Sequence, residues 1–159
     1  MSDIALVTNF AQLVEFFNQR GIPNLADMAA QAMESPVSAP PLDGRVYLRW
    51  EKDSPFLQIV YILIPDLPLE RLREVETACC QANARIALPG FGIDYTRRTI
   101  YFRISLPTVP GVQPLTLERM LLSVTGNSRD FLAAFRKVVE GEAGARIIDL
   151  AVANKPPAA

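Results

Sequence analysis

The apolar pattern changes its period several times along the middle of the chain, and the order of those changes constrains the fold most. Apolar residues alternate as in a strand at Arg45–Glu51 and Phe56–Ile64. A helical spacing follows over Leu69–Asn83, and two further strand-like stretches occupy Ala87–Tyr95 and Arg98–Leu106. This order predicts an α+β fold, an antiparallel sheet of about four or five strands covered by helices.

Helices are predicted on either side of this region. Asn9 and Gln12 have the spacing of a helix cap before a first helix, and Leu25–Met33 repeats the apolar spacing of a short second helix. A last helix is expected from Thr116, with Ser128 capping a second half if the glycine before it breaks the helix. The predicted order is therefore helix, short helix, two strands, helix, two strands and helix.

Composition predicts one domain with short appendages, since 159 residues is the size of a typical domain. Residues 1–33 should form the N-terminal helices, and the proline-rich residues 34–44 indicate an extended linker. Residues 45–150 should hold the α+β sandwich. The tail, residues 151–159, contains two adjacent prolines and is expected to fray.

Charge and hydropathy argue against several kinds of partner. A net charge of −1 with dispersed basic residues gives no field that would attract nucleic acid or an anionic membrane. The longest apolar run, Ile59–Ile64, is far shorter than the ~20 residues that span a bilayer. The N-terminal segment lacks the basic region and long apolar stretch of a secretory signal, so we expect a cytoplasmic protein.

Residues able to carry out catalysis are scarce. The sequence contains no histidine, the most frequent acid–base group and metal ligand. Cys79 and Cys80 are adjacent on a predicted helix and point about 100° apart, which suits neither a disulfide nor a metal site. The glycines of Gly90–Gly92 precede a strand, whereas a phosphate-binding loop precedes a helix. We therefore expect no catalytic centre, no metal and no cofactor.

The Phe56–Ile64 strand is apolar on both faces, which is typical of a strand covered by protein on each side. One side would face the domain's own helices, and the other needs an N-terminal helix, a second subunit or a client. Large exposed apolar patches are unusual on monomers, and a symmetric dimer is the commonest way to cover one. We therefore expect a homodimer, with folding back of the helix Asn9–Gln19 as the alternative.

Four short stretches within about Arg45–Glu140 carry a family pattern: Val46–Glu51, Glu74–Asn83, Leu88–Asp94 and Ile100–Arg103, the last followed by a Leu-Pro pair. They resemble the type III secretion chaperones and the YbjN-domain proteins related to them. The resemblance implies a small non-catalytic α+β domain, usually dimeric, that binds other proteins. Such chaperones hold an extended stretch of an effector against apolar patches on their strands and N-terminal helix.

The leading functional hypothesis is a protein-binding module with a protein client or partner. Its candidate partner-binding residues are apolar positions left over once one sheet face is filled: Phe10, Phe17, Trp50, Tyr61 and Tyr101. The alternative is a small-molecule-binding domain or weak enzyme. Its pocket would lie between sheet and helix, where aromatic and cationic groups can hold an anionic ligand: Tyr61, Tyr95 and Arg103.

Overall fold

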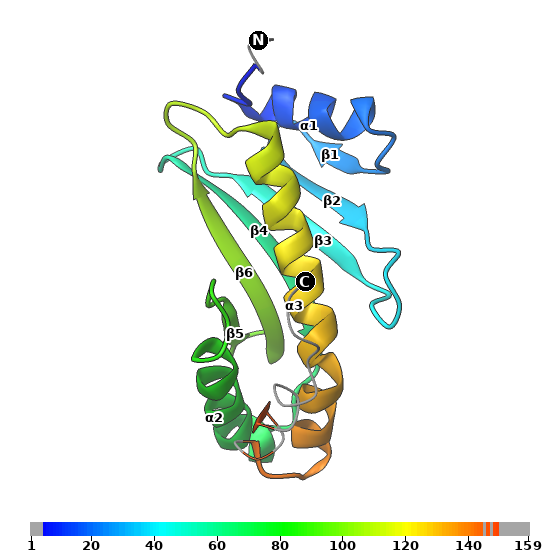
Figure 1. Cartoon of the computed structure of the whole chain (residues 1–159), viewed down its shortest axis with the longest axis vertical. Coiled ribbons are helices and arrows are strands. Elements are labelled where there is room, and N and C mark those ends of the chain that lie inside the picture. The colour runs from blue at the N-terminus through cyan, green and yellow to red at the C-terminus, as the bar shows by residue number, and fades with distance from the viewer. Residues whose placement is uncertain (1–4, 145, 147, 150–159) are drawn as a thin grey trace. The chain divides into compact units, whose positions relative to one another are not determined.

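The computed structural model describes residues 5–144, 146, 148 and 149 (Figure 1). Its elements are, in chain order, α1 (Phe10–Gln19), β1 (Leu25–Asp27), β2 (Ala32–Pro36), β3 (Arg45–Trp50), β4 (Phe56–Ile64), the 3₁₀ turn η1 (Leu69–Arg71), α2 (Leu72–Asn83), β5 (Phe91–Asp94), β6 (Thr99–Pro107) and α3 (Pro114–Glu140). The strands form a six-stranded antiparallel sheet in the order β1-β2-β3-β4-β6-β5. The α+β fold is confirmed, with more strands than predicted. The tail predicted to fray lies outside the described residues.

The chain forms two compact units. The first comprises Met1–Tyr61 and Ile104–Thr125, and the second comprises Ile62–Arg103 and Gly126–Ala159. Strands β4 and β6 and helix α3 each contribute residues to both.

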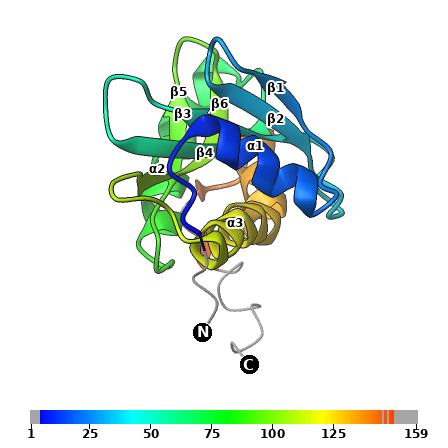
Figure 2. The same cartoon turned by 90° about the horizontal axis from the view of Figure 1, so that it is seen from above.

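Helix α1 begins at the predicted cap in the first unit. The Asn9 Oδ1 accepts a hydrogen bond from the Gln12 N–H at 3.0 Å, and the Gln12 Oε1 accepts one from the Thr8 N–H at 2.8 Å. Together these bonds satisfy one backbone donor of the first helical turn and one just before the helix. The helix lies beside the β1–β2 hairpin in both views (Figures 1 and 2) and buries Phe10, Leu13, Phe16 and Phe17.

Residues 24–33, predicted as a second helix, form an antiparallel hairpin instead. Strand β1 pairs with β2, and β2 pairs along its whole length with β3. Asp27 closes the turn, because its Oδ1 accepts from the N–H groups of Ala29 and Ala30, both at 2.9 Å. The helical assignment is therefore wrong. Strand β2 also extends to Pro36, the start of the stretch predicted as a linker.

The two central strands agree with the prediction, and β4 has the predicted bounds. One face of β4 is closed, with Leu57, Ile59, Tyr61 and Leu63 at most 7% exposed. The residues between them are half-buried, and Phe56 at the strand's start is exposed. Strand β4 therefore has one buried and one partly open face, although its sequence is apolar on both.

An aromatic cluster forms the core of the second unit. The Phe91 ring lies 4.7 Å from the Phe102 ring, 5.2 Å from Phe131 and 5.0 Å from Phe135, measured between centroids. Edge-to-face contacts at such distances add to the stabilisation from burial alone. The cluster brings together β5, β6 and the second half of α3.

Asn83, the last residue of α2, fixes the beginning of β5. Its Oδ1 accepts from the N–H of Gly90 at 3.0 Å and of Phe91 at 2.9 Å, and its Nδ2 donates to the Phe91 carbonyl at 2.9 Å. The side-chain amide thus bonds both backbone groups of Phe91, as a neighbouring strand would. Strand β5 begins at Phe91, later than the predicted start at Ala87.

Helix α3 runs without a break from Pro114, two residues before the predicted start, so the proposed cap at Ser128 is wrong. Ser128 is fully buried, and its hydroxyl has no hydrogen-bond partner among the described residues. Near the end of the helix, the Arg71 Nη2 donates to the carbonyls of Val138 at 2.6 Å and Glu142 at 2.9 Å. Among the described residues, no helix has the length and apolar character needed to cross a membrane.

Candidate protein-interaction surface

The β1–β4 part of the sheet in the first unit has two different faces. Side chains of β3 alternate strictly: Val46, Leu48 and Trp50 are buried, and the residues between them are exposed. Helix α1 and the first turns of α3 lie on one side of these strands (Figure 2). We use "outer face" for the side carrying the exposed and half-buried residues, namely Leu25, Asp27, Ala32, Glu34, Pro36, Arg45, Tyr47, Arg49, Phe56, Gln58 and Val60.

The strand register places apolar residues of the outer face side by side. Leu25 pairs with Glu34, Glu34 with Tyr47, and Tyr47 with Val60, so the four residues form one row across the strands. Leu25 is 68% exposed and Tyr47 is 40% exposed. Phe56, also 40% exposed, stands at the beginning of β4. Apolar and aromatic side chains are thus open to solvent on three of the strands.

The two arginines of the outer face each pair with a glutamate. Arg45 forms an ion pair with Glu34, and the Arg49 Nε lies 3.5 Å from the Glu51 Oε1. Exposed pairs of this kind contribute little to stability. They do neutralise the surroundings of Leu25 and Tyr47, which leaves a surface that repels neither an acidic nor a basic partner.

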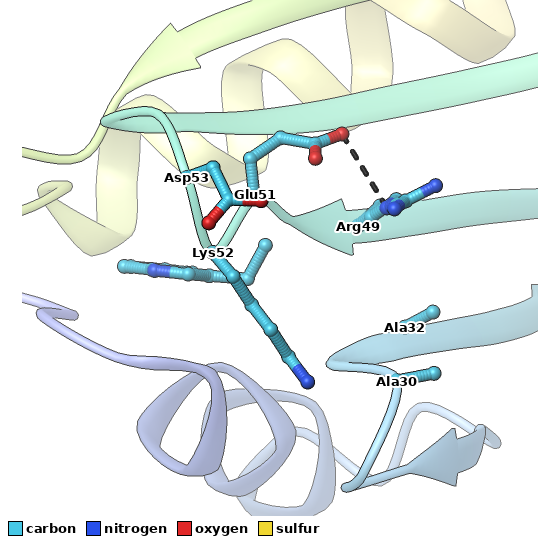
Figure 3. Close-up of a pocket in the computed structure, with 7 residues that line it drawn as sticks. Ala30, Ala32, Arg49, Glu51, Lys52 and Asp53 are labelled. Atoms are coloured by element: carbon cyan, nitrogen blue, oxygen red, sulfur yellow. Dashed lines mark ion pairs between the residues drawn. The ribbon is translucent and has the colours of Figure 1, made fainter.

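A cavity of about 320 Å³ lies at the end of the outer face (Figure 3). It is lined by residues of the β1–β2 turn, the start of β2, the end of β3 and the β3–β4 turn: Ala30, Ala32, Arg49, Trp50, Glu51, Lys52 and Asp53. The volume is at the lower end of the range found for small-ligand sites.

Backbone hydrogen bonds hold the walls of this cavity in place. The Trp50 N–H donates to the Gln31 carbonyl at 2.9 Å, and the Glu51 N–H donates to the Phe56 carbonyl at 2.9 Å. The Lys52 Nζ donates to the Ala29 carbonyl at 2.5 Å and so bridges the two turns. These bonds tie the two turns that line the cavity to each other and to the sheet.

The residues predicted to bind a partner lie mainly inside the protein. Phe10, Phe17 and Tyr61 are at most 2% exposed, so a partner can reach them only if the first unit opens, whereas Trp50 is 8% exposed and lines the cavity. Tyr101 is half-buried in the second unit, where its ring covers Gly92. A Cβ at Gly92 would lie 2.6 Å from the Tyr101 hydroxyl, so any larger residue there would require the Tyr101 ring to move. The partner-binding role of these residues stays a prediction.

The residues of the alternative ligand site make separate contacts. The Tyr61 hydroxyl accepts from the Gly44 N–H at 3.3 Å, whereas the Tyr95 hydroxyl donates to Glu76. The bond to Glu76 raises the pKa of Tyr95. The Arg103 guanidinium lies 5.5 Å from the centre of the Tyr101 ring. These observations do not assign a ligand to the three predicted residues.

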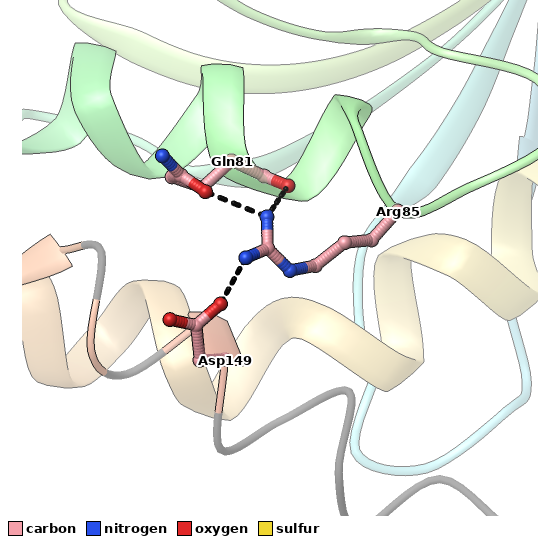
Figure 4. Close-up of polar contacts among 3 residues, drawn as sticks. All are labelled: Gln81, Arg85 and Asp149. Carbon is pink, nitrogen blue, oxygen red and sulfur yellow. Dashed lines mark hydrogen bonds and ion pairs between the residues drawn. The ribbon is translucent and has the colours of Figure 1, made fainter.

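The remaining polar cluster, in the second unit, joins α2 to the chain that follows α3 (Figure 4). The Arg85 Nη1 donates to the Gln81 carbonyl at 2.8 Å and to the Gln81 Oε1 at 2.6 Å, and Arg85 also forms an ion pair with Asp149. A single arginine thus joins the Gln81 main chain, the Gln81 side chain and Asp149, which indicates a structural role. Among the described residues, no three potential ligand side chains gather to hold a metal ion.

Sequence reasoning missed two of the exposed apolar residues of the outer face. Leu25 was assigned to the apolar stripe of a helix, and Phe56 was counted within a strand covered on both sides. The signal that identifies Tyr47 was present, since it alternates with Val46 and Leu48 in a strand with one polar face. Leu25 could not be placed because its neighbours depend on the pairing of β1 with β2.

Comparison with known proteins gives a structural answer only. No known protein family matches the sequence, and no curated protein matches it significantly. The crystal structure of YbjN from E. coli, a candidate transcription regulator, is similar with a TM-score of 0.61 and 10% identity, covering 81% of this chain and 95% of that one. A chain of the HopA1–SchA chaperone–effector complex is similar with a TM-score of 0.53 and 16% identity, covering 80% of this chain and 94% of that one.

These similarities concern the fold, because the sequence identities are low. They agree with the resemblance that the four sequence stretches suggested. The chain therefore has a fold of the YbjN and type III secretion chaperone kind.

Proposed function

We propose that this chain is a non-catalytic protein-binding module that holds a client or partner protein against its outer face. The observation that carries the proposal is the row formed by Leu25, Glu34, Tyr47 and Val60, in which Leu25 and Tyr47 are exposed and Val60 is half-buried. Exposed aromatic and aliphatic groups on a rigid sheet are typical of protein-binding surfaces. The structural similarity to a chaperone–effector complex supports the same function.

The proposal includes a cytoplasmic location. It also includes a homodimer, because a second copy is one way to shield the outer face when no client is bound. A symmetric dimer would use the same patch on both subunits. Sedimentation of the purified protein at tens of micromolar tests this part. A species of twice 17.6 kDa supports the dimer. A monomer that still binds a client contradicts the dimer and supports client binding alone.

The binding function is tested by immobilising the chain and identifying the proteins it retains from a lysate. We expect a reproducible set of proteins on the wild-type chain that is lost on the triple variant Leu25→Ser, Tyr47→Ser, Phe56→Ser. These side chains are exposed, so their replacement should change the folded structure little.

The control replaces two exposed apolar residues of α3, Leu115→Ser and Leu122→Ser, which are 51% and 70% exposed. It lowers surface hydrophobicity without touching the outer face, and it should keep the retained set. If both variants lose the retained proteins equally, the binding is nonspecific hydrophobic adsorption. If the triple variant retains the same proteins as the wild type, the partner surface lies elsewhere.

A further inference from the structure

The cavity at the end of the outer face combines an apolar wall with charged groups. Ala30 and Ala32 contribute methyl groups from the β1–β2 side, and Trp50 closes the β3 side. The tryptophan is 8% exposed, so most of its ring belongs to the core and the remainder forms part of the wall. Such a wall suits the methylene groups of a long side chain.

Not every charged side chain of this cavity has a hydrogen-bond or ion-pair partner. Figure 3 shows the Glu51 side chain extending to Arg49, and Lys52 extending from its own turn toward Ala30. Asp53 takes part in neither contact, and no described residue forms an ion pair or hydrogen bond with its side chain. Asp53 is therefore the charged side chain of this cavity that has no partner among the described residues, whereas the Lys52 ammonium is held by a backbone carbonyl.

The charges around the cavity are compatible with a cationic ligand. The whole chain carries a net charge of −1, so no long-range field repels a cation. The Arg49–Glu51 separation of 3.5 Å is longer than a close charged hydrogen bond, so Glu51 can accept a second donor.

We propose that this cavity binds the alkylammonium group of a lysine side chain from the protein held on the outer face. The methylene groups would lie along Ala30, Ala32 and Trp50, and the ammonium group would donate to Asp53. The lysine as the source of that group rests on the proposed function. Binding of an alkylammonium group does not, so the two are tested separately.

Trp50 makes the test direct, because it is the only tryptophan of the chain and it lines the cavity. The purified full chain is titrated with n-butylammonium, and Trp50 emission is followed into the tens of millimolar, where fragments of this size bind. We expect a saturable change with n-butylammonium and none with butyrate or 1-butanol. Equal or stronger saturation by butyrate, or no saturation by n-butylammonium, overturns the proposal.

Two variants locate the binding site. Asp53→Asn removes the free charge and should weaken n-butylammonium binding by about tenfold. Ala30→Leu fills the cavity from an exposed position and should abolish binding. The matched control is Asp43→Asn, an exposed acidic residue of the same unit that does not line the cavity. A loss of binding in the control equal to that in Asp53→Asn shows a general charge effect and also overturns the proposal.

A last comparison identifies the source of the cation. Lysine with blocked main-chain ends should bind at least as well as n-butylammonium, and the same compound acetylated on its Nε should not bind. A free diamine such as putrescine that binds much more tightly than blocked lysine would overturn the lysine assignment. That result would leave the protein-binding function of the outer face untouched, because the lysate experiment measures it independently.

Discussion

Ser128 is the buried polar residue of α3 whose hydroxyl lacks a partner among the described residues. A hydroxyl removed from water without a hydrogen bond lowers stability. We expect Ser128→Ala to raise the free energy of unfolding by about 1 kcal/mol, because alanine removes the unsatisfied group and favours the helix. Urea unfolding measures the change. Thr125→Val, which removes a hydroxyl bonded to the Leu121 carbonyl at 3.0 Å, should give no such gain.

Cys79 gives a pH-dependent prediction. Burial, followed by the charges of Cys80 and Glu76, raises the pKa of Cys79 from 9.0 to about 12. The unfolded thiol therefore loses its proton at lower pH than the folded one, so the stability that Cys79 contributes is complete below pH 9.0 and is lost as the pH rises to about 12. We expect wild-type protein to lose more unfolding free energy over this interval than Cys79→Ala.

The exposed neighbour Cys80 provides the control, since the unfolding free energy of Cys80→Ala should depend on pH as that of the wild type does. Alkylation supplies a second readout. At neutral pH one thiol should react in the folded protein, and the second should react only after unfolding. Rapid modification of both would contradict the burial of Cys79.

At the scale of elements, the junction between α2 and β5 depends on one side chain. Asn83 makes three hydrogen bonds to the backbone of Gly90 and Phe91. We expect Asn83→Ala to lower the free energy of unfolding by about 2–3 kcal/mol, because backbone groups lose their partners next to the aromatic cluster. Asn18→Ala, which removes a single exposed bond, should cost far less. Equal costs would show that the bonds at β5 are replaced by water.

The sequence predicts correctly those elements whose order of apolar and polar residues fits only one kind of secondary structure. Strand β3 alternates and β4 is continuously apolar, and both were placed almost to the residue. The β1–β2 hairpin was missed because Leu25, Met28, Ala32 and Met33 also satisfy a helical spacing. The pairing of β2 with β3 decided the outcome, and a contact between distant segments leaves no local signal.

For the candidate surface too, only the features that depend on a single strand could be predicted from the sequence. The exposure of Tyr47 follows from alternation within its own strand, whereas its position beside Leu25 follows only from the register of three strands. The cavity could not be foreseen. Ala30 and Lys52 are far apart in the sequence, and they line one space only because β2 and β3 pair as they do.

At the scale of the whole molecule, three elements are shared between the two units, so the units should unfold together. Phe135 is fully buried in the second unit, and Trp50 reports on the first. We expect Phe135→Ala to lower the denaturant midpoint of Trp50 fluorescence, with a loss of about 3–5 kcal/mol. The circular dichroism transition should move equally. A Trp50 transition that stays in place while the circular dichroism signal shifts would show two independent domains.

The strict alternation along β3 also has an evolutionary consequence. Folding constrains the buried residues Val46, Leu48 and Trp50, whereas the exposed residues between them are free of that constraint. The surface of this strand can therefore change by substitutions at every second position, without rebuilding the interior. Divergence of this kind erodes sequence identity faster than architecture.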